Sequence, residues 1–152
     1  MKRIILILIM LCILTTVSFG QELNKDNFQK EVLESDKLVV IDFWAKWCKY
    51  CKLLDPVIER LMIFNQRYKK DKIKWFKVDV DKDRKFLNNF RPFRGLPVVV
   101  FYKNGKEVYR FVGFQPFLKI QDIINSLLKE EKKEKKEKDN CKGGTCYPPE
   151  GY

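Results

Sequence analysis

Short, nearly continuous hydrophobic runs mark the strands of this chain. The clearest run is 38–44, which is apolar on both faces, as in a buried parallel strand. Further strands are expected at 73–80 and 97–102. A further strand is expected at 107–112, because Asn104-Gly105 before it tolerates the positive φ angles of a tight hairpin. The pattern therefore predicts four strands, of which the last two form a hairpin, and leaves open whether a short strand precedes them near Leu23.

Helices are indicated where hydrophobic residues recur every three or four positions. This spacing occurs at 27–34, 48–68 and 116–128, and an acidic start favours another helix from 81 to about 90. Pro56 should bend the long helix, since it removes one backbone hydrogen bond. The order β-α-β followed by β-β-α predicts an α/β fold with a mixed central sheet and helices on both faces. In the long helix, the residues expected to pack inward are Leu53, Leu54, Val57, Ile58, Leu61, Met62 and Phe64.

The first twenty residues have the pattern of a secretory signal. Residues 1–20 begin with Lys2 and Arg3, continue with an apolar run from Ile4 to Val17, and end in small residues. This order is typical of a signal peptide, here cleaved after Gly20. An uncleaved membrane anchor is the alternative, although the run is short for a membrane span. The sequence therefore predicts a protein that is periplasmic or otherwise exported.

Composition narrows the classes of site that the chain can hold. Its 152 residues suffice for one domain with a hydrophobic core, and 31 Lys and Arg against 20 Asp and Glu give a net charge of +11. The basic residues are scattered and form no nucleic-acid motif, so we interpret them as a solvated surface that favours acidic partners, not nucleic acid. The absence of histidine excludes Cys-His catalytic pairs and histidine metal ligands.

The chemistry of the chain centres on a Cys-x-x-Cys motif formed by Cys48 and Cys51. Two cysteines three positions apart in the first turn of a helix lie on the same side, close enough to form a disulfide. Unpaired backbone N–H groups and the helix dipole stabilise a thiolate at the first cysteine, and Lys46 and Lys49 add positive charge. We therefore predict Cys48 as nucleophile and Cys51 as resolving cysteine in thiol–disulfide exchange. A structural disulfide or half of a zinc site is the alternative.

The residues around this motif resemble those of thioredoxin-like proteins. The resemblance spans about 24–129 and implies the thioredoxin fold, an oxidoreductase acting on disulfides or thiols of protein substrates, and no bound organic cofactor. Its further matches are a buried carboxylate at Asp42, a helix kink at Pro56, a cis-proline loop at Gly95-Leu96-Pro97, a last hairpin at Lys103-Asn104-Gly105-Lys106, and Gly113.

The resemblance also implies roles for individual residues. Asp42 would accept the proton of the buried cysteine, and Lys77 falls where the family places a lysine partner on the adjacent strand. An ordinary edge-facing lysine is the alternative at Lys77. Pro97 would lie beside the disulfide and leave the backbone of Leu96 free to pair with a substrate peptide. The residues expected to contact substrate are Trp47, Leu96 and Gly113, with Trp44 and Phe93 also on the rim.

The residues between the two cysteines depart from thioredoxins, which have Gly-Pro where this chain has Lys49-Tyr50. A tyrosine before the second cysteine resembles bacterial periplasmic disulfide isomerases and reductases. The dipeptide tunes the reduction potential, so reduction, isomerisation and exchange of disulfides all stay open as the physiological direction. We expect a monomer that receives electrons from a membrane-bound or soluble thiol donor. The alternative of another class is a redox-silent binding module, either a chaperone or a metal carrier.

A charged linker and a cysteine-containing tail, residues 130–152, follow the globular domain, which is assigned to 21–129. Residues 129–139 are almost entirely Lys and Glu, which indicates either an exposed helical extension or a disordered tether. Three hypotheses are open for Cys141 and Cys146 beyond it. They form a second dithiol that exchanges electrons with the Cys-x-x-Cys pair, a disulfide that closes a small loop, or two ligands of a four-cysteine zinc site.

Overall fold

A five-stranded mixed sheet forms the centre of the computed structural model, which describes residues 21–69, 71–82, 84–88, 90 and 94–141. For 130–141 it describes the backbone only. The strand order is β1-β3-β2-β4-β5, with β1 and β2 parallel to β3, and β4 antiparallel to both β2 and β5. The strands are β1 Gln21–Glu22, β2 Leu38–Trp44, β3 Ile73–Asp79, β4 Val98–Lys103 and β5 Lys106–Val112.

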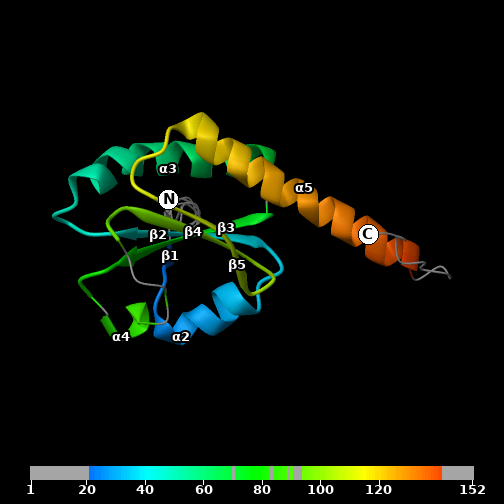
Figure 1. Cartoon of the computed structure of the whole chain (residues 1–152), viewed down its shortest axis with the longest axis horizontal. Coiled ribbons are helices and arrows are strands. Elements are labelled where there is room, and N and C mark those ends of the chain that lie inside the picture. Colours follow the sequence, from blue (N-terminus) through cyan, green and yellow to red (C-terminus); the bar gives the residue numbers. More distant parts are fainter. Residues whose placement is uncertain (1–20, 70, 83, 89, 91–93, 142–152) are drawn as a thin grey trace, which may run out of the picture.

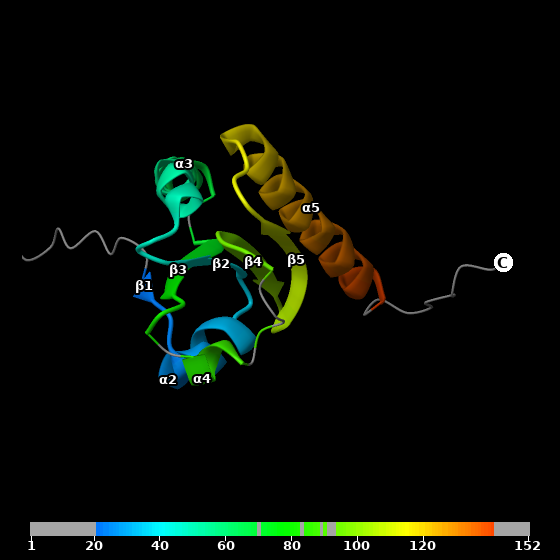
Figure 2. The same cartoon turned by 60° about the vertical axis from the view of Figure 1, so that its left-hand side comes forward.

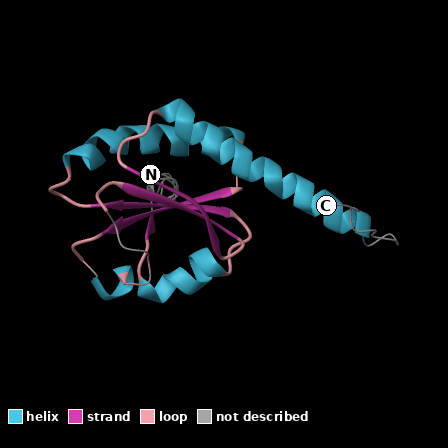
Figure 3. Cartoon of the chain, in the orientation of Figure 1, coloured by secondary structure: helices cyan, strands magenta, loops and turns pink. Residues whose placement is uncertain are grey.

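Helices cover both faces of this sheet. Figure 1 and Figure 3 show α3 and α5 on one face, and α2 and α4 on the other. Figure 2 shows the same two layers from a second direction, with α5 running alongside β5. The predicted mixed sheet with helices on both faces is therefore confirmed. The helices are α2 Lys25–Phe28, the π-helical η1 Gln29–Leu33, α3 Lys49–Tyr68, α4 Arg84–Leu87 and α5 Phe117–Cys141.

Two of the predicted helix boundaries were wrong, for local reasons. The first helix begins at Lys25 because the side chain of Asn24 accepts hydrogen bonds from the backbone N–H groups of Asp26 and Asn27. The side chain of Asn27 in turn accepts one from the backbone N–H of Asn24. This capping box starts the helix two residues before the predicted start. Of the helix expected from 81 to 90, the described residues contain only the single turn of α4.

Most of the core consists of two hydrophobic clusters, one on each face of the sheet. Successive side chains of a strand point to opposite faces, so Leu38 and Val40 of β2 pack toward α3 and α5, whereas Val39 and Ile41 pack toward the other layer. Burial on both faces explains why β2 is apolar along nearly its whole length. By the same alternation, Asp42 faces the α3 side of the sheet.

Helix α3 packs on the sheet through a narrower stripe than its sequence indicates. Leu54, Ile58 and Leu61 are buried, as predicted. Leu53 was expected to pack inward as well, but it lies one position off this stripe and is 57% exposed. Phe64 is 38% exposed, and its ring contacts those of Tyr68 and Phe117.

The last helix settles the conformation of the charged segment. Helix α5 continues without interruption through 129–141, so the helical extension is correct and the disordered tether is wrong. It projects beyond the sheet, away from the beginning of α3, as Figure 1 shows. At about 1.5 Å per residue, its 25 residues span roughly 37 Å. In the described part of the chain, no helix is long and apolar enough to cross a membrane.

The hairpin between β4 and β5 yields a test of backbone strain. Asn104 and Gly105 both have positive φ, as the sequence predicted, and a Cβ atom at Gly105 would lie 2.5 Å from the carbonyl oxygen of Leu33. Gly105→Ala should therefore lower the free energy of unfolding by more than about 2 kcal/mol, measured by urea denaturation. Gly113→Ala is the matched control, because Gly113 also has positive φ but its Cβ would meet nothing within 4 Å. Equal losses in the two variants would contradict a role for the Leu33 contact.

Candidate active site

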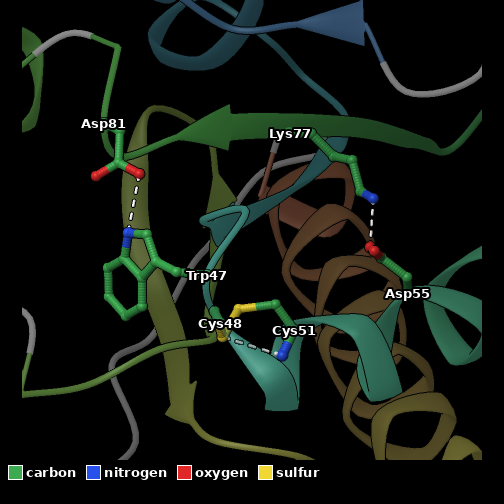
Figure 4. The surroundings of a disulfide bond; sticks show 6 residues. All are labelled: Trp47, Cys48, Cys51, Asp55, Lys77 and Asp81. Carbon is green, nitrogen blue, oxygen red and sulfur yellow. Dashed lines mark hydrogen bonds and ion pairs between the residues drawn. A yellow bond between two sulfur atoms is a disulfide. The ribbon is translucent and has the colours of Figure 1, made fainter.

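The two cysteines of the Cys-x-x-Cys motif are joined by a disulfide at the beginning of α3. Cys48 is the N-cap residue of this helix, and its Sγ accepts a hydrogen bond of 3.0 Å from the backbone N–H of Cys51. Figure 4 shows this bond beside the disulfide. The same N–H group would stabilise a thiolate on Cys48 in the reduced protein. The disulfide predicted from the spacing is present.

Trp47 is held beside the disulfide by a residue from another element. Its ring is 67% exposed, and its Nε1–H donates a 2.9 Å hydrogen bond to Oδ2 of Asp81, which follows β3 (Figure 4). Oδ1 of Asp79 in turn accepts a hydrogen bond from the backbone of Asp81. Sequence reasoning assigned Asp81 only to a helix start. The sequence could have indicated this contact, because Asp81 follows β3 and Trp47 follows β2. These two strands are parallel and therefore end at the same edge of the sheet.

The proline loop lies against the disulfide from the β4 side. The Leu96–Pro97 peptide bond is cis, as the resemblance implied, and Leu96 packs on the cluster formed by Ala45 and the two cysteines. The backbone N–H of Gly113 donates a 2.8 Å hydrogen bond to the carbonyl oxygen of Pro97. Three residues predicted for the site, Leu96, Pro97 and Gly113, are thus brought together. Phe93 lies outside the described residues.

Asp42 is a buried carboxyl group with an unsatisfied oxygen. Its side chain is 3% exposed, and Oδ1 has no hydrogen-bond partner among the described residues. Burial raises the pKa of Asp42 from its ordinary 3.8 to about 7, with Lys77 lowering it and Asp55 raising it. Both protonation states are therefore populated near neutral pH, as a proton acceptor in this pH range requires.

Lys77 lies beside Asp42 but is paired with a different acid. The two residues are register partners on parallel strands β2 and β3, as the predicted position implied. The ammonium group of Lys77, however, forms an ion pair with Asp55 of α3 (Figure 4). It also lies 5.6 Å from the centre of the Trp44 ring. Sequence reasoning missed Asp55. Its signal was the spacing of four residues after Cys51, which places both side chains on one side of the helix.

Cys141, the first of the tail cysteines, does not lie at this site. Cys141 ends α5, which extends away from the beginning of α3 in Figure 1, and Cys146 lies outside the described residues. Across the described ranges, no group of three or more Cys, Asp or Glu side chains is arranged to hold a metal ion. The helical conformation of 129–141 therefore disfavours both the zinc hypothesis and the second-dithiol hypothesis, since each requires the tail to reach Cys48.

The fold, the disulfide and the proline loop can now be compared with known proteins. A family model described as thioredoxin matches residues 20–126. The chain belongs to the thioredoxin family. A thioredoxin of Rickettsia felis is 35% identical over 106 residues, which cover 70% of this chain and 96% of the relative. A thioredoxin of Malassezia sympodialis is 40% identical over 87 residues, which cover 57% and 79%.

A solved structure supports the same assignment. The crystal structure of the Malassezia sympodialis thioredoxin matches this fold with a TM-score of 0.60 at 36% identity, covering 72% of this chain and 93% of that one. The protein is therefore a thioredoxin-type thiol–disulfide oxidoreductase that acts on protein disulfides, with Cys48 and Cys51 as its cysteine pair. Family membership favours this activity over the redox-silent binding module.

The buried carboxyl group predicts a pH-dependent stability. Since the pKa of Asp42 is 3.8 when unperturbed and about 7 in the fold, the fold loses stability as pH rises from 4 to 7 and loses no more above that. Asp42→Asn removes this loss. At about 1.4 kcal/mol per pKa unit, we expect a gain of roughly 2–4 kcal/mol near pH 8 and almost none near pH 4. Urea unfolding of the disulfide form at both pH values measures it. A pH-independent gain, or a large loss, would contradict the assignment.

The direction of α5 predicts that the tail is dispensable for the reaction. Removing residues 130–152 should leave the rate of disulfide reduction within about twofold of the full chain, because Cys141 is held away from Cys48. The full-length Cys51→Ser variant, in which mixed disulfides persist, should show no adduct between Cys48 and either tail cysteine by peptide mass spectrometry. A trapped Cys48–Cys141 or Cys48–Cys146 adduct, or a marked loss of rate on truncation, would restore the second-dithiol hypothesis.

Proposed function

We propose that the protein is an exported thioredoxin that reduces or exchanges disulfide bonds in proteins outside the cytoplasm. The observation that carries the chemistry is the Cys48–Cys51 disulfide, whose first sulfur caps α3 and whose surroundings contain a buried acid, Asp42. Membership of the thioredoxin family supports thiol–disulfide exchange as the reaction, and the residue pattern of the first twenty positions supports a location outside the cytoplasm.

In the first step, the Cys48 thiolate attacks one sulfur of a substrate disulfide. A Cys48–substrate disulfide forms, the substrate S–S bond breaks, and the second substrate sulfur leaves as a thiolate with the electron pair. The Cys51 N–H bond and the helix dipole favour the attacking thiolate, and exposed Lys46 and Lys49 add positive charge around it. Substrate backbone pairs with Leu96 in this proposal, while Trp47 and Gly113 contact its side chains.

In the second step, Cys51 resolves the mixed disulfide. The thiol proton of Cys51 passes to the Asp42 carboxylate, and the new thiolate attacks Sγ of Cys48. The Cys48–Cys51 bond forms while the Cys48–substrate bond breaks, and the remaining substrate sulfur leaves as a thiolate that takes a proton from water. The substrate disulfide is thereby reduced by two electrons, and the cysteine pair of the protein is oxidised. A membrane-bound or soluble dithiol then reduces the pair for the next cycle.

The residue pattern of the first twenty positions supports export. Residues 1–20 combine basic residues at the start, an apolar run and small residues before Gln21. Tyr50, between the cysteines, is exposed, so a redox partner can contact it. We further propose that the mature protein acts as a monomer.

Export and reduction are tested together by expressing the full chain and its Cys48→Ser variant in a Gram-negative bacterium. In whole cells, a thiol reagent that cannot cross the inner membrane should label the wild-type cysteines after mild reduction, but not those of a form lacking residues 2–20. Purified wild-type protein should accelerate insulin reduction by dithiothreitol, and Cys48→Ser should lower that acceleration by at least about 100-fold. Labelling only after lysis would refute export, and an unchanged rate in Cys48→Ser would refute the mechanism.

A further inference from the structure

Asp55 joins the long helix to the strand beside the buried acid. It lies in the second turn of α3 and pairs with the ammonium group of Lys77, and both side chains are about a quarter exposed, at 29% and 25%. Lys77 is in turn the register partner of Asp42. One cation thus lies near two carboxyl groups, and its ion pair is with the more exposed of the two.

The groups that face Asp42 come from three elements. Strand β3 contributes Lys77, helix α3 contributes Asp55, and strand β4 contributes the apolar Val99, the register partner of Asp42 on its other side. The disulfide cysteines do not titrate. The charged groups that act on Asp42 are therefore Lys77 and Asp55, and these two residues form an ion pair with each other.

The position of the Lys77 ammonium group determines how strongly it can act on Asp42. The ion pair with Asp55 fixes that position from one side, and the Trp44 ring 5.6 Å away flanks it from the other. Without the Asp55 carboxylate, Lys77 would still have the acid Asp42 beside it, as its register partner on β2. Its long, flexible side chain can turn toward that acid.

We propose that Asp55 is a positioning residue that sets the protonation of Asp42 by holding the Lys77 ammonium group in an ion pair. This inference rests on the proposed function, in which Asp42 accepts the proton of Cys51. Asp55 itself touches neither the substrate nor the reacting sulfur atoms in this scheme. It acts in two ways, since its own negative charge disfavours the Asp42 carboxylate and the ion pair restrains the cation that would favour it.

The consequence concerns the second step of the reaction. Cys51 loses its proton to Asp42, and Asp42 must lose that proton to water before the next cycle. A carboxyl group with an ordinary pKa would be a weak acceptor at neutral pH, whereas one that titrates near neutrality can both accept and release the proton. By this inference Asp55 helps to keep the titration of Asp42 close to the pH at which the cysteine pair reacts.

The experiment compares four variants of the full chain. Asp55→Asn removes the charge, Asp55→Glu retains it, Lys77→Gln removes the cation, and Glu59→Gln removes a carboxylate one turn further along α3 as the matched control. The first readout is the pKa of Asp42 in the disulfide form, followed by carbon-13 NMR of its carboxyl group. The second is the pH dependence of product thiol release in a single turnover with a peptide disulfide. Circular dichroism establishes that each variant is folded.

We expect Asp55→Asn to lower the midpoint of the Asp42 titration by about one pH unit and to shift the rate profile by a similar amount to lower pH. Lys77→Gln should raise the Asp42 midpoint, and a general loosening of the structure would not produce these opposite shifts. Asp55→Glu and Glu59→Gln should both leave the midpoint close to that of the wild type.

The two readouts distinguish a failure of this inference about Asp55 from a failure of the proposed role of Asp42 as proton acceptor. An Asp42 midpoint that does not fall in Asp55→Asn, or that falls equally in Glu59→Gln, overturns the role of Asp55. If the midpoint falls in Asp55→Asn but the rate profile does not move, Asp55 does control the charge of Asp42. That result would instead overturn Asp42 as proton acceptor in the proposed function.

Discussion

The burial of β2 between two hydrophobic clusters is the constraint on which the site depends. Val39 and Ile41 are covered on one face and Leu38 and Val40 on the other, so the strand can pair with its neighbours in only one register. A shift by one residue would turn every side chain to the opposite face. The same burial that fixes the cysteine pair at the end of the strand also removes water from Asp42, and desolvation is the largest cause of its altered titration.

Electrostatics at this site follow from an uneven distribution of charges. Asp42, Lys77 and Asp55 carry two potential negative charges and one positive charge in a small region on the α3 face of the sheet. The cation pairs with the acid that water still reaches, where an ion pair needs little desolvation. The deeper acid keeps an oxygen that no described residue satisfies. Such an arrangement lowers stability at neutral pH, and this cost is common for groups that carry out proton transfer.

The backbone of the site was predictable from sequence, whereas several of its side-chain contacts were not. Cys48 and Asp42 could be placed because each depends on the local order of a buried strand and the helix that follows it. The pairs Trp47–Asp81 and Lys77–Asp55 join residues that are remote in sequence, so they depend on how one element is rotated against another. The early start of α2 was missed for a different reason. Its cap is a mutual bond between two asparagines, and the familiar signal has Ser or Thr followed by Glu or Gln.

The hydrogen bond from Gly113 to Pro97 has a consequence for folding. The rim of the site consists of the start of α3, the loop before β4 and the residue after β5, and these segments meet only when β2, β4 and β5 have paired. Contacts between residues so distant in sequence are slow to form, because chain entropy must be lost before they contribute. A fragment that contains only the motif and its helix has the sulfur chemistry but no rim to orient a substrate. Selective reactivity toward protein disulfides is therefore a property of the completed sheet, and a nascent chain acquires it only after β5 has been synthesised.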